Sequence, residues 1–258
     1  MAVWRQIATI TALCLWGAGC ARTPARTAQE EMNACVPSGT VVLAGVHLDR
    51  VRGSTTFQKL AGEALSFLEP VKDADSLLAA YDGSDLVLIG HGAFEKAPAG
   101  ATLVTPKLAV TGSARAVQAA LRQYSTGKPG APALVAAAQP VSAQAIWAAA
   151  EGGAKLPLHG NLENLNRLLG LTDHVTLGVD VNTAVTLQVT GDGRSADAAR
   201  QLEETLRSFI SLATATTRDH DLATLLEKMT IAREGTTVRV MAVATPEEIG
   251  KLVGAAGR

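Results

Sequence analysis

Histidine side chains are the first candidates for chemistry, because a neutral imidazole serves both as a metal ligand and as a general base. No two of the five histidines are three to five residues apart, so the helical zinc spacing is absent. The densest metal-like cluster is Asp219-His220-Asp221, which fits a helix cap followed by an exposed first turn better than a metal site. His91, in Gly90-His91-Gly92, shares strand parity with Val87 and Ile89 and is predicted to lie within a sheet with few titratable neighbours.

Motifs for covalent or phosphate chemistry are missing. The glycine-containing stretches 90–100 and 191–196 lack dinucleotide-binding spacing, the Lys-Ser/Thr pair of a P-loop is absent, and no G-x-S-x-G elbow occurs. Asp82 and Asp180 are expected in hairpin turns, where Asp is favoured for backbone reasons. The sequence therefore predicts no catalytic residue, no cofactor-binding residue and no metal ligand.

Cys20 is the residue whose surroundings do predict chemistry. One positive charge, Arg5, precedes the uncharged stretch from Ile7 to Gly19, which is shorter than the roughly 20 residues of a spanning helix. A short basic start, an apolar core and the small residues Gly17-Ala18-Gly19 are typical of a secretory signal peptide.

Together with Cys20, this stretch resembles a bacterial lipobox, although Gly17 stands where that pattern prefers Leu. The resemblance covers residues 1–20 and implies cleavage before Cys20, a lipid such as palmitate on this cysteine, and anchoring to a bacterial membrane on its periplasmic or cell-surface face. Two alternatives stay open: cleavage by secretory peptidase that leaves Cys20 as a plain thiol, and a cytosolic core helix over residues 7–19.

The other cysteines are few. Cys14 leaves with the signal peptide. Cys35 is unpaired, bonded to another molecule or, if Cys20 is not lipidated, the disulfide partner of Cys20. Both Cys20 and Cys35 precede the first expected strand, so neither is predicted to matter to the fold. With no cysteine beyond position 35, the core must hold the fold together.

Composition excludes some function classes. The chain is 47% hydrophobic, only 3% aromatic, and carries a net charge of −1 without a basic run. Nucleic-acid binding, which relies on basic patches and stacking aromatics, is therefore not expected. Stacking of sugars is disfavoured for the same reason, because Trp147 is the only tryptophan after the signal peptide.

Hydrophobic periodicity predicts alternating strands and helices from residue 39 onward. Strands are expected over 40–48, 143–150 and in hairpins at 75–94 and 174–191, with two more in 101–111 and a last hairpin turning at Glu234-Gly235. Amphipathic helices are expected from Ser54 to Leu68, after Ser113, over 161–170, and after Ser195, Asp219 and Thr245. In the helix after Ser195, the inward residues are expected to be Leu202, Leu206, Phe209, Ile210 and Ala213.

The two halves have the same order of elements, and the hairpins align without a gap at an offset of 98. The predicted fold class is α+β, with antiparallel sheets, helices packed on one side, and a duplicated strand-helix-hairpin-helix unit; chance similarity of generic patterns is the alternative. The expected divisions are a signal peptide (1–19), a lipid-anchored flexible tether (20–38), a first repeat (39–127) and a second repeat (128–258). The layout resembles that of uncharacterised exported bacterial proteins.

The sequence thus predicts an exported, membrane-anchored lipoprotein with a non-catalytic binding, scaffolding or sensing domain in the cell envelope, working with an envelope protein as partner. The alternative is an envelope hydrolase or metal-dependent enzyme whose site is assembled from distant residues. A deep pocket with converging polar groups would favour the enzyme, whereas an exposed apolar patch would favour a partner surface.

Overall fold

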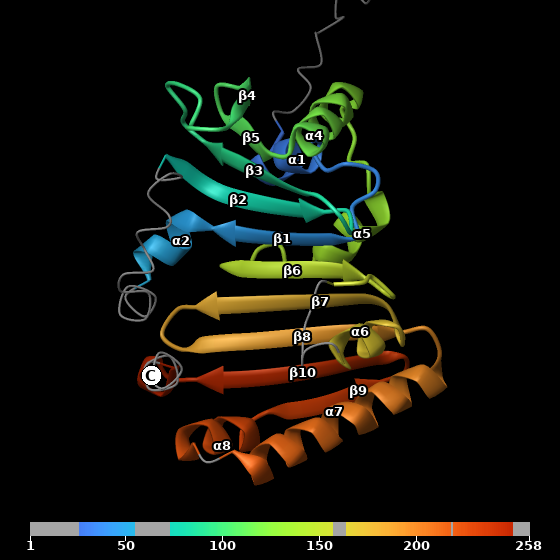
Figure 1. The fold of residues 1–258 in the computed structure, drawn as a ribbon. Helices are drawn as coiled ribbons and strands as arrows, with labels where there is room; N and C mark the ends of the chain where they lie inside the picture. The colour runs from blue at the N-terminus through green and yellow to red at the C-terminus, as the bar shows by residue number, and fades with distance from the viewer. Residues whose placement is uncertain (1–25, 55–72, 157–163, 218, 250–258) are drawn as a thin grey trace, which may run out of the picture.

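A single antiparallel sheet of ten strands organises the molecule (Figure 1). The computed structural model describes residues 26–54, 73–156, 164–217 and 219–249. The strand order is β4-β5-β3-β2-β1-β6-β7-β8-β10-β9, so β1 and β6 lie side by side at the centre. The strands are β1 (Val42–His47), β2 (Ala74–Tyr81), β3 (Leu86–Gly92), β4 (Thr102–Thr105), β5 (Leu108–Gly112), β6 (Ile146–Glu151), β7 (Thr172–Val181), β8 (Val185–Gly193), β9 (Thr230–Glu234) and β10 (Thr237–Ala244).

Helices connect and cover these strands, and most begin at the residues that the sequence indicates. Ser113, Ser195 and Asp219 each accept a backbone N–H in the first turn of the following helix. The helices are α1 (Ala28–Asn33), α2 (Leu48–Gly53), α4 (Ala114–Thr126), α5 (Pro132–Ala138), α6 (Asn164–Leu169), α7 (Ala196–Thr216) and α8 (His220–Glu227). The short helices α2 and α5 are not predicted from the sequence, and the helix expected over 54–68 falls largely outside the described residues.

Strand order is the same in the two halves of the sheet. In each half the first three strands in sequence are neighbours, and the fifth lies between the third and the fourth. The hairpins β2–β3 and β7–β8 thus occupy equivalent positions on either side of the centre (Figure 1). The gapless alignment at an offset of 98 is wrong in detail, because the two turns differ in length. The last pair before the turn is Tyr81 with Leu86 in the first hairpin and Val181 with Val185 in the second.

The helices do not share one side of the sheet, contrary to the prediction. Residues directly opposite each other in antiparallel strands lie on the same face. One row of paired residues comprises Val42, Ala150, Val175, Gly191 and Val238, and the next row, on the other face, comprises Leu43, Ala149, Thr176, Thr190 and Arg239. Leu43 packs in the cluster formed with α1, α4 and α5, whereas Val238 packs against α7 and Val46 packs against α2, so helices lie on both faces of the sheet.

Trp147 is the largest fully buried side chain and ties the first half to the centre of the sheet. It lies directly opposite Gly45 on β1. A Cβ atom at Gly45 would come within 2.2 Å of the Trp147 ring, so the glycine makes room for the indole. Met32, Cys35 and Leu134 belong to the same apolar cluster.

The folded region begins earlier than the tether boundary at residue 38 predicts. Thr27 and Glu30 form a reciprocal capping box that starts α1. Beyond this helix, Cys35 and Val36 are fully buried. Cys35 is therefore part of the core, and the expectation that it does not matter to the fold is wrong.

Burial of Cys35 also makes stability depend on pH. Desolvation of the thiolate raises the pKa of Cys35 to about 12. Because the pKa is higher in the native state, the buried neutral thiol contributes its full stabilisation below the pKa of the unfolded state, near 9.0. This contribution is lost as the pH rises toward 12. In a chain beginning at residue 21, we expect the stability advantage of wild type over Cys35→Ala to shrink by about 1.4 kcal/mol between pH 7 and pH 10, as measured by urea unfolding. An advantage that is constant over this range would contradict the burial of the thiol.

Candidate functional site

An apolar cavity of about 320 Å³ lies between the sheet and the helices α6 and α7. Its floor is the face of β1, β6, β7 and β8 that carries the row through Val42 and Val238. Every residue that lines it is apolar; they are Val42, Ala148, Ala149, Ala150, Leu156, Leu165, Leu168, Leu169, Val175, Leu177, Val189, Gly191, Leu202 and Leu206. This volume falls within the range of roughly 300–1,000 Å³ that is usual for small-molecule sites.

Small side chains create this space. Ala148 and Ala150 on β6 and Gly191 on β8 project little or nothing toward the helices, while leucines of α6 and α7 form the opposite wall. Native interiors are packed to crystal-like density and rarely leave voids larger than a water molecule. A cavity of this size among aliphatic residues is therefore an exception to the packing of an ordinary core.

Burial in the two halves of the sheet differs accordingly. In the first half, Leu43, Leu78 and Ile89 have no exposed surface beneath α1, α4 and α5. In the second half, Val175, Leu177 and Val189 are only half-buried, and Leu165 at the cavity is 43% exposed. The aliphatic layer of the second half is thus incompletely covered by the described part of the chain.

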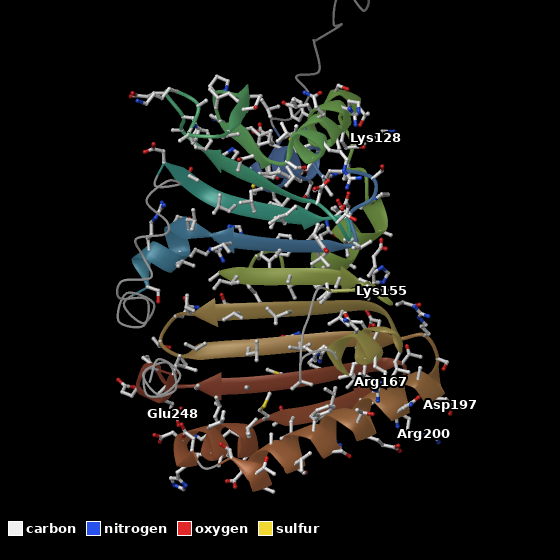
Figure 2. The ribbon with its side chains drawn as sticks, in the orientation of Figure 1. Lys128, Lys155, Arg167, Asp197, Arg200 and Glu248 are labelled. Carbon is white, nitrogen blue, oxygen red and sulfur yellow. The ribbon has the colours of Figure 1, made fainter. Side chains whose placement is uncertain are left out.

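Two exposed cations are the sequence neighbours of residues that line this cavity. Lys155 precedes the lining residue Leu156, and Arg167 precedes Leu168 on α6; both are exposed. They lie on the same side of the molecule as the start of α7 (Figure 2). Neither side chain forms an ion pair with any residue that the structure describes. A basic margin beside an aliphatic cavity suits an amphiphile with an anionic head group.

His91 lies on β3 with its side chain 16% exposed, as its strand parity predicts. The prediction of few titratable neighbours needs a correction, because Nε2 of His91 lies 3.5 Å from a carboxylate oxygen of Glu31 on α1. The sequence does not reveal this pair because α1 belongs to the stretch interpreted as tether.

A serine and a second histidine lie beside His91. Ser76 on β2 is its cross-strand neighbour, and the Ser76 hydroxyl lies 3.2 Å from Nδ1 of His47. Nε2 of His47 lies 2.8 Å from the carbonyl oxygen of Ser142. Because a carbonyl only accepts, Nε2 carries the proton, and in the neutral ring Nδ1 accepts from Ser76.

The serine of this pair is largely buried. Ser76 is only 7% exposed, and it lines neither the aliphatic cavity nor the cavities beside α1 and α4. A nucleophile must be reachable by its substrate. The contacts of Ser76 are therefore best explained by the need to pair polar groups inside the sheet.

The other sequence candidates are placed as follows. Asp219 caps α8, with His220 exposed in its first turn, as predicted. No cluster of three potential metal ligands occurs among the described residues. Asp82 lies in the β2–β3 turn as predicted, but Asp180 lies within β7, where its carboxylate accepts the N–H of Ala145. Cys20 lies outside the described residues, so its lipidation stays a prediction.

Comparison with known proteins gives a match by fold. No family profile and no curated protein matches the sequence. Crystal form III of TP0453, a lipoprotein of Treponema pallidum, resembles the chain with a TM-score of 0.53 at 9% identity, covering 87% of this chain and 98% of that one. Crystal form I of the same protein gives a TM-score of 0.48 at 10% identity, covering 87% and 96%. The chain shares the fold of a bacterial lipoprotein. In the described residues no helix is both long and apolar enough to cross a bilayer.

The cavity itself is missed by the sequence reasoning. Alternation in 185–190 correctly indicates one apolar face, but alternation is the same whether protein or ligand covers that face. Helical periodicity after Ser195 predicts that Phe209 points inward, whereas it is 44% exposed. The remaining signal is the run of alanines at 148–150, which marks a strand with little side-chain volume.

Proposed function

We propose that the chain is an exported lipoprotein, anchored through Cys20, whose folded domain binds the acyl chain of an anionic amphiphile in the cavity between the sheet and α6 and α7. The observation that supports this most strongly is the wholly aliphatic lining of a cavity large enough for a ligand. Lys155 and Arg167 fit a carboxylate or phosphate head group at its margin. The role is binding rather than catalysis, since no polar group lines the cavity.

A lipid anchor at Cys20 and a cavity for an acyl chain are consistent with one function. TP0453, whose fold the chain resembles, is itself a lipoprotein. A lipid on Cys20 would hold the domain close to a bilayer, a source of acyl chains, through the residues that precede α1. The two sets of five strands with the same order also support the proposal that the domain arose by internal duplication. In the second half, α6 and α7 lie over the aliphatic face of the sheet and leave the cavity between themselves and the strands.

Binding should depend on chain length. Burial of each methylene contributes about 0.8 kcal/mol, so removal of two carbons from a saturated fatty acid whose chain lies wholly inside the cavity is expected to weaken binding about tenfold. Isothermal titration of the chain beginning at residue 21 with fatty acids of 8, 10, 12 and 14 carbons measures this series. Affinity that does not vary with length, or no saturable binding at all, would contradict the proposed function.

A further inference from the structure

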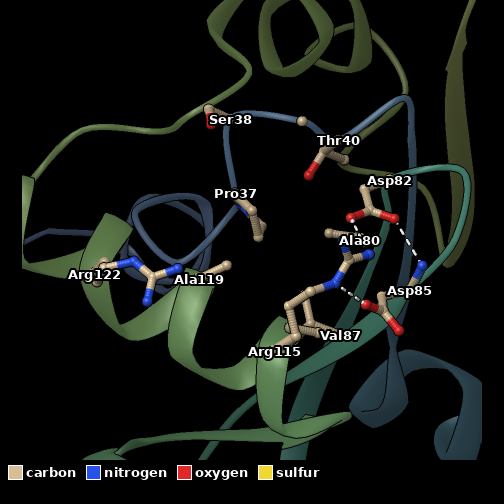
Figure 3. Close-up of a pocket in the computed structure, with 12 residues that line it drawn as sticks. Pro37, Ser38, Thr40, Ala80, Asp82, Asp85, Val87, Arg115, Ala119 and Arg122 are labelled. Atoms are coloured by element: carbon tan, nitrogen blue, oxygen red, sulfur yellow. Dashed lines mark hydrogen bonds and ion pairs between the residues drawn. The ribbon is translucent and has the colours of Figure 1, made fainter.

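A second cavity, of about 280 Å³, lies in the first half of the sheet at the β2–β3 turn and differs in chemistry from the first. Three segments enclose it: the loop of residues 37–40 that follows α1, the β2–β3 turn, and the first three turns of α4. Figure 3 shows charged side chains on both sides of it, with Arg122 on one side and Asp82, Asp85 and Arg115 on the other. It is separate from the aliphatic cavity, with which it shares no lining residue.

On one side of this cavity the charged side chains are paired with one another. Arg115 donates to Asp85 through Nε, and its Nη2 lies 3.3 Å from a carboxylate oxygen of Asp82. The backbone N–H groups of Asp85 and Ser84 donate to the other Asp82 oxygen at 2.7 Å and 2.8 Å. The N–H of Asp85 is the main cause that holds the pKa of Asp82 below its usual value, with smaller contributions from Ser84 and Arg115. Arg115 is therefore committed to these two carboxylates.

Two polar groups at the cavity lack partners among the described residues, Thr40 beside Asp82 and Arg122 across from them (Figure 3). The hydroxyl oxygen of Thr40 is buried and has no hydrogen-bond partner, although Thr40 is only 2% exposed. In Figure 3 this hydroxyl is directed into the cavity. Buried hydroxyls almost always find a partner, so an orphan one calls for an explanation. The guanidinium of Arg122, on α4, forms no ion pair or hydrogen bond with the part of the chain that the structure describes.

We infer that this cavity binds a small oxyanion, a carboxylate or phosphate group, between Arg122 and Thr40. A guanidinium presents paired N–H donors that match the oxygens of either group, and the Thr40 hydroxyl supplies a further donor. Arg115 holds the turn in place instead of binding the anion. The apolar floor, formed by Ala80, Val87 and Ala116, leaves room for a short hydrocarbon part of the ligand.

Titration calorimetry with inorganic phosphate and with acetate, each on the full chain and on Thr40→Val and Arg122→Gln, tests this inference. We expect saturable binding of at least one anion, weakened tenfold or more in each variant. The preferred anion tells a phosphate ligand from a carboxylate ligand. Lys128→Gln is the matched control: it removes a charge just beyond the end of α4, outside the cavity lining, and should leave binding unchanged.

Thermal unfolding without ligand distinguishes a binding role from a structural one. Thr40→Val keeps the shape of the side chain and removes an unpaired hydroxyl, so its melting temperature should equal or exceed that of wild type while anion binding falls. The inference is overturned if neither anion binds, or if binding is the same in Thr40→Val and Arg122→Gln as in Lys128→Gln.

Discussion

An Ala148→Phe variant is expected to bind a long-chain fatty acid at least tenfold more weakly than wild type. Ala148 is half-buried on β6 and lines the aliphatic cavity. A phenyl ring at this position occupies space that would otherwise take several methylenes of the ligand, each of which contributes about 0.8 kcal/mol of binding. Loss of as few as two methylenes corresponds to about tenfold in affinity, which titration calorimetry measures directly.

Ala79→Phe is the matched control for this variant. Ala79 on β2 lies in the same cross-strand row as Ala148, with Ala44 between them, and is half-buried on the same face, but it does not line the cavity. The two variants therefore add the same ring to the same face of one sheet. We expect Ala79→Phe to bind with the affinity of wild type. Equal weakening in both variants would mean that the added bulk acts through the fold and not through the cavity.

A Cys20→Ser variant is expected to be lost from the membrane fraction or to keep its signal peptide. Each buried methylene of an acyl chain contributes about 0.8 kcal/mol to attachment, and a single chain holds only reversibly, whereas several chains hold firmly. A lipidated cysteine at the new N-terminus would carry several. Fractionation of cells that express each chain, followed by mass spectrometry of the mature N-terminus, measures the effect.

Cys35→Ala serves as the control for the anchor. It removes the other cysteine of the mature chain while keeping an apolar side chain at a fully buried position. This variant should remain in the membrane fraction with an acylated residue 20. An unacylated terminus at any other position, in wild-type protein that washes off with buffer, would exclude the anchor.

Local sequence signals were sufficient for most of the elements. Alternating aliphatic residues predict both long hairpins, and cap residues such as Ser113, Ser195 and Asp219 place the starts of three helices correctly. These signals depend on neighbours in the chain. The boundary of the tether was wrong because the packing of Cys35 and Val36 against strands far away in sequence leaves no local pattern.

Placement of helices on two opposite faces could not be predicted in the same way. Each hairpin has one aliphatic face, but its periodicity does not say toward which side of a ten-stranded sheet that face points. The answer depends on the pairing of β1 with β6, which sets Leu43 and Ala149 on one face and Val42 and Ala150 on the other. The aliphatic cavity follows from this long-range arrangement, and so does the oxyanion site, whose Thr40 and Arg122 are far apart in the sequence.

Quenching of tryptophan fluorescence by a brominated fatty acid tests most directly whether an acyl chain occupies the cavity. In the chain that begins at residue 21, Trp147 is the only tryptophan. Its indole packs on the face of β6 that points away from the cavity, so it lies about one sheet thickness from the lining residue Ala148. We predict saturable quenching in wild type and in Ala79→Phe, with little in Ala148→Phe. Quenching that is undiminished in Ala148→Phe would contradict an acyl chain in this cavity.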